Sequence, residues 1–348
     1  MSFSPTKRNG TLMGISFVAL ISILATLLSQ TSTLKSLGIS PLVVGIVIGI
    51  IFANSLYHKM PTLWETGITF SAKKILRFAI VFYGFRITFQ QIAEVGLEGF
   101  LVSFIMLAST FILGTWIGTK VFKMDEDTSI LTASGAAVCG AAAVLATEPV
   151  VKAQEYKTAI AISMVVLFGT ISMFLYPLLH TTAILDMTAK EFGIYVGGTI
   201  HEVAQVVAVP ASVPGISPEA ANTAVIVKMT RVIMIAPMLI ILGIWLSYKA
   251  QKSGETSSKV KLVIPWFAVY FIGVAAFNSL NLVPNNIVDW INEIDTFLLT
   301  MAMVALGIGT RFTKFKGLGL APLYTALTMF IWLVVGGYFI TKLICYTF

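Results

Sequence analysis

The segment Gly198–Val207 carries three side chains capable of chemistry inside an otherwise apolar stretch: His201, Glu202 and Gln205. Such groups are costly in a lipid bilayer unless they face a cavity or a partner. On a helix, His201 and Gln205 share a face because they are four residues apart, while Glu202 is turned away by about 100°. We therefore expect His201 and Gln205 to face a substrate and Glu202 to face a neighbouring helix. A purely structural histidine is the alternative, and an imidazole that titrates near neutral pH could also couple proton movement to transport.

Two basic residues, Lys228 and Arg231, lie one helical turn apart and well inside the next apolar run. Both are too far from its ends to reach water easily by extending their side chains. We expect one of them to pair with Glu202 or Glu148, which leaves the other to bind an anion. Alternatively, both cations neutralise carboxylates and only hold the helices together.

A run of small residues, Gly135–Ala143, precedes Glu148 and Pro149 in another apolar segment. Glycine is a poor helix former and proline cannot donate a backbone hydrogen bond, so we expect this helix to be interrupted. The second half of an interrupted helix presents free amides that can bind an anion. The alternative is that small residues only allow close helix packing.

Glycines and a proline flank His201 in a similar way, which predicts a second interruption. The candidate helix-breaking residues are Gly135, Pro149, Gly197, Gly198 and Pro210. The candidate substrate-binding residues are Cys139, Gly140, Ala141, His201, Gln205, Lys228 and Arg231, with Glu148 and Glu202 as coupling or ion-pair residues.

Composition places the chain among polytopic membrane proteins. Of its 348 residues, 57% are hydrophobic and 11% charged, and the mean hydropathy is +0.90. Because no alternating strand pattern is present, we expect an all-α membrane protein. Apolar runs of about 17–25 residues predict eleven spans. They are 11–29, 39–57, 74–92, 99–121, 128–150, 157–180, 190–212, 220–247, 262–281, 287–309 and 319–344.

Basic residues test that count through the bias of lysine and arginine toward cytoplasmic loops. With a cytoplasmic N-terminus, eleven spans leave only Lys35, Lys152, Lys157 and Lys342 on the outer side. The C-terminus is then outside. The sequence predicts one transporter unit: a cytoplasmic N-terminus at 1–10, spans 1–8 at 11–247, a cytoplasmic linker at 248–261 and spans 9–11 at 262–344.

An internal repeat connects the two sides of the linker. Residues 41–56 are similar to residues 265–280, and residues 79–84, continuing to Phe89 and Gly96, are similar to residues 302–307, continuing to Phe312 and Gly319. Spans 2 and 3 would then correspond to spans 9 and 10. An odd separation inverts the two copies, which is how many secondary transporters are built.

Several segments together resemble the YeiH-like sulfate exporter family of bacterial inner-membrane proteins. They are Ser134–Ala143, Thr199–Val207, Val227–Pro237, Ile264–Phe267 with Phe277–Leu280, and Ala305–Thr310. The resemblance implies the fold of sodium/proton antiporters and bile-acid symporters, with two crossed, interrupted helices in a mobile core and a separate scaffold. The interruptions would fall at Gly135–Ala143 and near Gly197–Pro210. The predicted repeat does not pair these two segments with each other.

The favoured function is therefore a secondary transporter that moves a small anion by alternating access, with proton coupling left open. The resemblance suggests sulfate or a related sulfur oxyanion. A cation/proton antiporter using Glu202, Glu148 or His201 is the alternative, and fold analogy does not decide between them.

An intramembrane enzyme is disfavoured because His201-Glu202 lacks the second histidine of a zinc motif and no GxSxG occurs. The lone Cys139 and Cys345 predict neither a metal site nor a disulfide, and no cofactor is expected. The expected partners are the anion and the lipid bilayer. No basic nucleic-acid motif is present, and a homodimer is left open.

Overall fold

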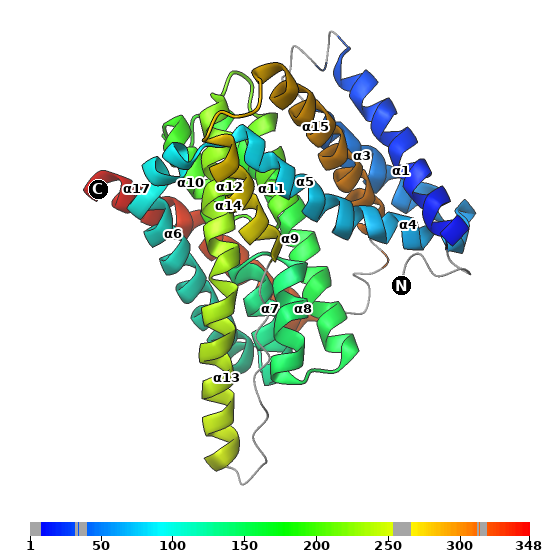
Figure 1. The fold of residues 1–348 in the computed structure, drawn as a ribbon. Helices are drawn as coiled ribbons and strands as arrows, with labels where there is room; N and C mark the ends of the chain where they lie inside the picture. The colour runs from blue at the N-terminus through cyan, green and yellow to red at the C-terminus, as the bar shows by residue number, and fades with distance from the viewer. Residues whose placement is uncertain (1–7, 32–33, 35–39, 253–265, 312, 314–318) are drawn as a thin grey trace. The chain divides into compact units, whose positions relative to one another are not determined.

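The computed structural model describes residues 8–31, 34, 40–252, 266–311, 313 and 319–348, which are almost entirely helical and contain no strand. The chain divides into two compact units (Figure 1). Unit 1 comprises residues 1–93, 207–217 and 267–315, and unit 2 comprises residues 94–206, 218–266 and 316–348. Most of the predicted N-terminal segment and linker, at 1–7 and 253–261, lies outside the described residues, as does Phe312.

The helices of unit 1 come from both ends of the chain. They are α1 (Arg8–Ser29), α3 (Pro41–Ser55), η1 (Tyr57–Lys59), η2 (Thr62–Trp64), α4 (Glu65–Phe70), η3 (Ser71–Ile75), α5 (Leu76–Tyr83), η4 (Gly84–Arg86), η6 (Pro210–Ser212), α14 (Trp266–Asn278) and α15 (Asn285–Gly309).

The helices of unit 2 surround the central part of the chain. They are α6 (Phe89–Trp116), which begins in unit 1, η5 (Ile117–Val121), α7 (Glu126–Ala137), α8 (Ala141–Val151), α9 (Glu155–Thr181), α10 (Ala189–Thr199), α11 (Val203–Ala208), which ends in unit 1, α12 (Pro218–Ile233), α13 (Ile235–Lys252), α16 (Leu320–Ile331), η8 (Trp332–Gly336) and α17 (Gly337–Thr347).

Six helical runs of the described chain are long and apolar enough to cross a membrane. They are Arg8–Ser29, Phe89–Val121, Tyr156–Thr181, Pro218–Lys249, Asn285–Gly309 and Leu320–Thr347, while α3 and α14 are shorter apolar helices. This supports several membrane crossings, but the predicted spans 128–150 and 190–212 have a different structure, and the predicted span 74–92 covers the end of one helix and the start of α6.

The predicted span 128–150 folds as a hairpin of α7 and α8, which lie side by side in Figure 1. Lys157 at the start of α9 forms an ion pair of 2.8 Å with Asp127 at the start of α7. Deeper in the unit, a Cβ built at Gly135 would lie 2.6 Å from Val165 Cγ2. Because α7 and α9 therefore run parallel, α8 must return between them. The prediction of one continuous crossing here is wrong.

The predicted span 190–212 also reverses direction. A Cβ built at Gly193 would lie 2.6 Å from the carbonyl oxygen of Ala220, and one built at Gly197 would lie 2.8 Å from Val227 Cβ. The residue numbers on both helices increase from the first contact to the second, so α10 and α12 run parallel. The chain through α11 must therefore return, and this segment is a second hairpin rather than a single crossing.

The two hairpins point in opposite directions within unit 2. The rings of Tyr176 and Tyr195 stack with centroids 4.8 Å apart, and those of His180 and Phe192 lie 4.3 Å apart, so α9 and α10 are antiparallel. Since α7 runs parallel to α9, α7 and α10 approach each other from opposite ends of the unit.

Matching contacts relate the two hairpins as copies of one motif. The contact of Gly135 on α7 with Val165 on α9 recurs as the contact of Gly197 on α10 with Val227 on α12. The interval from Gly135 to Gly197 in the sequence equals the interval from Val165 to Val227. The sequence repeat paired neither hairpin with another segment, and these contacts indicate that α7–α8 and α10–α11 are equivalent to each other.

The same relation includes the helices outside the hairpins. A Cβ at Gly114 on α6 would lie 3.0 Å from Ala133 Cβ, and one at Gly337 on α17 would lie 3.3 Å from Tyr195 Cε2. Ala133 and Tyr195 are separated in the sequence by the same number of residues as the two hairpins. Gly114 and Gly337 are separated by the much larger number of residues that relates the two copies of the sequence repeat. Two different shifts along the chain are thus needed to describe the contacts of one unit.

Unit 1 repeats its contacts with the shift seen in the sequence. Asn54 on α3 donates through Nδ2 to the carbonyl of Thr310 at 3.0 Å, and Asn278 on α14 donates to the carbonyl of Ile87 at 3.2 Å. The two donors are separated along the chain by almost the same interval as the two acceptors. Each copy therefore packs against the other: α3 contacts the residue that follows α15, and α14 contacts the residue that follows α5 and η4.

Gly49 and its repeat partner Gly273 offer a matched test of this packing. A Cβ at Gly49 would lie 2.9 Å from Gly307 Cα, whereas one at Gly273 meets nothing within 4 Å. We expect Gly49→Ala to destabilise the protein by about 1–3 kcal/mol through overpacking, and Gly273→Ala to be neutral or stabilising. Thermal unfolding in detergent checks this, and equal melting of both variants would contradict this packing.

The α7–α8 hairpin can be tested by cross-linking. We expect Asp127→Cys with Lys157→Cys to form a disulfide or to react with a short bifunctional reagent in a cysteine-free background. One continuous helix over 128–150 would separate the two positions by about 35 Å. Asp127→Cys with Lys190→Cys, at opposite ends of unit 2, is the control pair that should not react. Failure of the first pair with a folded variant would exclude the hairpin.

Candidate functional site

The tip of the α7–α8 hairpin is formed by residues Val138–Gly140. All residues of α7 from Thr128 to Ala137 are buried, and Val138 leaves helical geometry with φ −119° and ψ −86°. Gly140 has a φ of +74°, which side chains other than that of glycine strain to adopt. A Cβ at Gly140 would also lie 2.5 Å from Glu202 Cγ. Glycine at this position therefore permits both the turn and the close approach of the second hairpin.

The tip of the α10–α11 hairpin is formed by Ile200–Glu202. Ile200 is extended, with φ −72° and ψ 147°, and its amide still donates to the carbonyl of Val196. The side chains of His201 and Glu202 are 3% and 8% exposed. Because His201 lies outside α11, it does not share a helical face with Gln205 as predicted. Gln205 instead accepts a 3.2 Å hydrogen bond from the amide of Glu202.

Lys228 on α12 joins the two tips. Its side chain is completely buried, and Nζ donates to the carbonyl of Val138 and to that of Ile200, both at 2.6 Å. The last carbonyls of a helix have no partner within the helix, and a cation at that end also opposes the helix dipole. Lys228 therefore neutralises the C-terminal ends of α7 and α10 at the same time.

Arg231 lies one turn further along α12, and its guanidinium donates hydrogen bonds to the C-terminal end of α7. Nε donates to the carbonyl of Ala137 at 2.6 Å, and one terminal nitrogen donates to that of Ala136 at 2.9 Å. The other terminal nitrogen, Nη1, has no hydrogen-bond partner among the described residues. The hydrogen bonds described for both cations go to backbone carbonyls, whereas the prediction assigned one cation to a carboxylate.

Glu202 occupies the place where an anion was expected. Its Oε1 lies 3.5 Å from the amide nitrogen of Ala141, the first residue of α8. This helix end carries a partial positive charge and unpaired amides, so a carboxylate is stabilised there. Glu202 also interacts electrostatically with Lys228 and with Cys139 at the opposite tip.

The charges at the tips sum to a positive value. Lys228 and Arg231 contribute two positive charges, and ionised Glu202 contributes one negative charge. With about half a charge per helix end, the C-termini of α7 and α10 subtract about one, and the N-termini of α8 and α11 add about one. The total of about +1, together with the spare donor on Arg231 Nη1, favours an anion. His201 Nδ1 is likewise buried without a partner among the described residues.

The structure brings most of the predicted residues together but changes several roles. Gly135, Gly197 and Gly198 lie inside regular helices, where they allow close packing, and the turns fall after them. Pro149 lies within α8 without interrupting it.

Two predicted residues, Pro210 and Glu148, lie outside the hairpin tips, and one buried carboxylate was not predicted. Pro210 begins η6, just after α11 ends. Glu148 is partly buried on α8 and takes part in none of the ion pairs of the described residues. Asp295, a buried carboxylate on α15, was missed although its position within the apolar run 287–309 was a visible signal.

Lys228 is expected to be more important for folding than an exposed lysine. Lys228→Met leaves two buried carbonyls without a donor, at about 1–3 kcal/mol each, so stability should fall by about 2–6 kcal/mol. Lys190→Met, which removes a partly exposed ion pair with Glu98, should cost less than about 1 kcal/mol. Unfolding in detergent measures both, and similar losses would contradict the bridging role of Lys228.

Known proteins resemble this chain over nearly its whole length. The family model described as conserved hypothetical protein 698 matches residues 13–326. A UPF0324 membrane protein of Pseudomonas putida is 46% identical over 341 residues, which cover 98% of this chain and 96% of that protein. Relatives from Bacteroides thetaiotaomicron and Haemophilus influenzae, also named UPF0324 membrane proteins, are 46% and 45% identical over 333 and 327 residues. These cover 95% and 94% of this chain, and 98% and 95% of those proteins.

No solved structure matches the chain. The relatives are named as membrane proteins, and six helical runs of the described chain are long and apolar enough to cross a bilayer. The chain is therefore a multi-pass membrane protein that belongs to the family described as conserved hypothetical protein 698.

Proposed function

We propose that this protein is a secondary transporter that moves a small anion by alternating access. The observation that carries the proposal is the meeting of two opposed hairpin tips at the buried cations Lys228 and Arg231. The resemblance in sequence suggests sulfate or a related sulfur oxyanion as the substrate.

The backbone geometry supports transport. In a bilayer, backbone that leaves helical geometry is tolerated only where protein buries it or where it lines a water-filled cavity. Interrupted helices that meet near the membrane midplane, related by an inverted repeat, are typical of secondary transporters. We infer that the two hairpins, residues 126–151 and 189–208, are the inverted copies, with unit 2 as the mobile core and unit 1 as the scaffold.

The spare donors support an anion as the substrate. Arg231 Nη1 is completely buried and has no partner among the described residues, and an unsatisfied buried donor is costly. A guanidinium that already holds Ala136 and Ala137 is fixed in orientation, so its free edge is prepared for an oxyanion. His201 can supply a second contact.

A cation/proton antiporter remains the second candidate because of one specific feature. Glu202 places a carboxylate, 8% exposed, at the junction of the two tips, where loss or gain of a proton would change the local charge. In that mechanism Glu202 carries the proton, and Lys228 and Arg231 are structural. An enzymatic role is not proposed, because the described residues offer no group of three or more metal-binding side chains and the sequence lacks hydrolase motifs.

The hairpins also change the proposed topology. With α7–α8 and α10–α11 entering from opposite sides, we propose nine crossing segments among the described helices: α1, α3, α4–α5, α6, α9, α12–α13, α14, α15 and α16–α17. Lys152 and Lys157 then move to the side of the N-terminus, and Lys190 moves to the other side. The positive-inside bias becomes stronger, which supports a cytoplasmic N-terminus and an external C-terminus in the bacterial inner membrane. A homodimer in the bilayer is compatible with this topology.

Anion flux into proteoliposomes tests the proposal. We expect labelled sulfate, sulfite, chloride or acetate to accumulate or exchange, with and without a pH gradient. Arg231→Lys retains the charge but loses the planar fork, so flux should fall at least about tenfold, an effect of about 1.4 kcal/mol on the barrier. Arg77→Lys on the exposed face of α5 is the matched control and should transport normally. Labelled sodium movement coupled to protons, with no flux of any anion tested, would favour the antiporter instead.

A further inference from the structure

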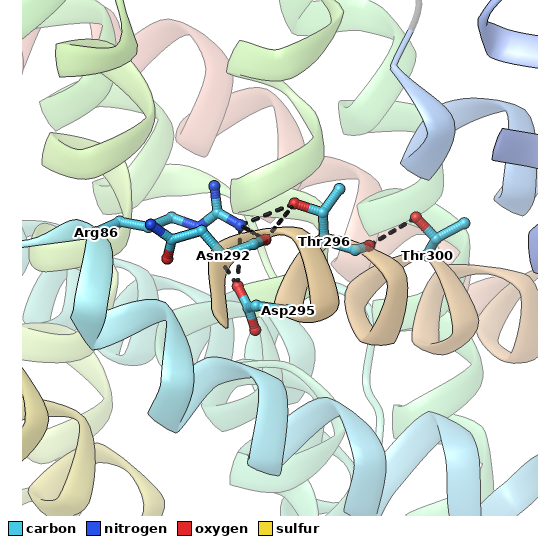
Figure 2. A network of polar contacts seen from close by, with 5 residues as sticks. All are labelled: Arg86, Asn292, Asp295, Thr296 and Thr300. Atoms are coloured by element: carbon cyan, nitrogen blue, oxygen red, sulfur yellow. Dashed lines mark hydrogen bonds and ion pairs between the residues drawn. The ribbon is translucent and has the colours of Figure 1, made fainter. Parts of the chain in front are cut away.

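A second buried polar cluster lies in unit 1, apart from the residues of the hairpin tips. Figure 2 shows Arg86 from η4 reaching residues on successive turns of α15. Its terminal Nη2 donates to the carbonyl of Asn292 and, at 2.8 Å, to the hydroxyl of Thr296. Arg86 lies near the end of the predicted span 74–92, and its side chain contacts α15.

Asp295 is the carboxylate of this cluster, and its contact with Arg86 is long. Both Nε and Nη2 of Arg86 lie 3.4 Å from Oδ2 of Asp295. Ion pairs between a guanidinium and a carboxylate usually bring nitrogen and oxygen within about 2.7–2.9 Å. The shorter hydrogen bonds of Arg86 go to neutral oxygens of Asn292 and Thr296. The guanidinium therefore gives Asp295 only part of the stabilisation that an ionised carboxylate needs.

Two acceptors in the cluster have no donor among the described residues. They are Oδ1 of Asp295 and Oδ1 of Asn292, both buried, and the two residues are one helical turn apart on α15. The side chain of Asp295 is 0% exposed, while that of Arg86 is 26% exposed. A buried carboxylate with an unsatisfied oxygen is expensive, and such a group usually takes up a proton instead.

One bound proton removes the charge that the surroundings of Asp295 compensate only in part. A protonated carboxyl group is neutral, so its burial beside the long contact with Arg86 costs less free energy than burial of a carboxylate. We propose that Asp295 is a proton-binding site, which exchanges its proton with water through the partly exposed side of Arg86. The step is the addition of a proton from hydronium to one carboxylate oxygen, and its reverse.

The surroundings of Asp295 favour a proton over a metal cation. Arg86 faces the carboxylate directly, and its positive charge would repel sodium or a divalent ion. The phenol of Tyr83 on α5 is the other titratable group that interacts with Asp295, and the ring of Tyr83 lies 5.1 Å from the Arg86 guanidinium. Asp289 and Glu293 on the same helix are exposed, so their charges are in contact with the surroundings of the protein rather than buried beside Asp295.

The consequence for transport rests on the proposed function: Asp295 would be the group that links a pH gradient to movement of the anion. The site itself requires no anion, so the two ideas can fail separately. Proton binding at Asp295 with no anion flux would leave this inference intact and overturn the transporter, and the reverse result would do the opposite.

Infrared difference spectroscopy between acidic and alkaline pH tests the site in the purified full-length protein. The parent should show the band of a protonated carboxylic acid that disappears as the pH rises, Asp295→Asn should lack that band, and Asp289→Asn should retain it. Asp295→Glu, which keeps a titrating acid, should shift the band. An unchanged band in folded Asp295→Asn, or a band that is absent from the parent, would overturn the proposal. So would a response of the parent to sodium at constant pH.

Thermal stability provides a second measurement that separates the proton site from a structural ion pair. An amide has nearly the shape of a protonated carboxyl, so Asp295→Asn should melt with the parent at acidic pH. If Asp295 were an ionised partner of Arg86, the same substitution would leave a partly buried guanidinium without its counter-ion and lower the melting temperature at every pH. That result would also overturn the proposal.

Discussion

Unpaired backbone carbonyls at the hairpin tips are the constraint on which unit 2 depends. The helices α7 and α10 both end in fully buried surroundings, and a helix that ends there leaves carbonyl oxygens without donors. Lys228 and Arg231 supply four hydrogen bonds to these oxygens from a single helix. This explains why two cations are tolerated at complete burial, and why α12 must pack closely along α10 through Gly193 and Gly197.

The hairpins are copies in their backbone but not in their charges. At the interval that relates the two hairpins, Lys228 and Arg231 correspond to Val166 and Gly169 on α9. A lysine close to the point where two equivalent tips meet can serve both, so a second copy is unnecessary and would add an uncompensated buried charge. The space at Gly169 is taken by the amide of Gln205 from α11. The departure from symmetry is therefore concentrated where substrate recognition is proposed.

The arrangement of repeats explains why the sequence repeat was incomplete. The equivalent helices of unit 1 are separated by one number of residues along the chain, and the two hairpins are separated by another. The reason is that α7–α8 comes after α3 and α5 in the sequence, whereas α10–α11 comes before α14 and α15. A sequence comparison at a single offset finds α3 with α14 and α5 with α15 but cannot find α7–α8 with α10–α11. The paired contacts of Asn54 and Asn278 indicate that the first match was structural.

The sequence by itself determined the membrane class, the helical architecture, the presence of two interruptions and the buried polar residues around them, but not the buried carboxylate Asp295. It could do so because a bilayer penalises each polar group, which makes His201, Lys228 and Arg231 visible in any apolar run. Tertiary structure alone decided that the interrupted segments turn back, that backbone carbonyls rather than carboxylates hold the cations, and that Arg86 approaches Asp295. The reason is that a reversal of direction has the same apolar composition as a crossing, and a backbone oxygen is present at every residue. Only the path of the chain places those oxygens beside Lys228.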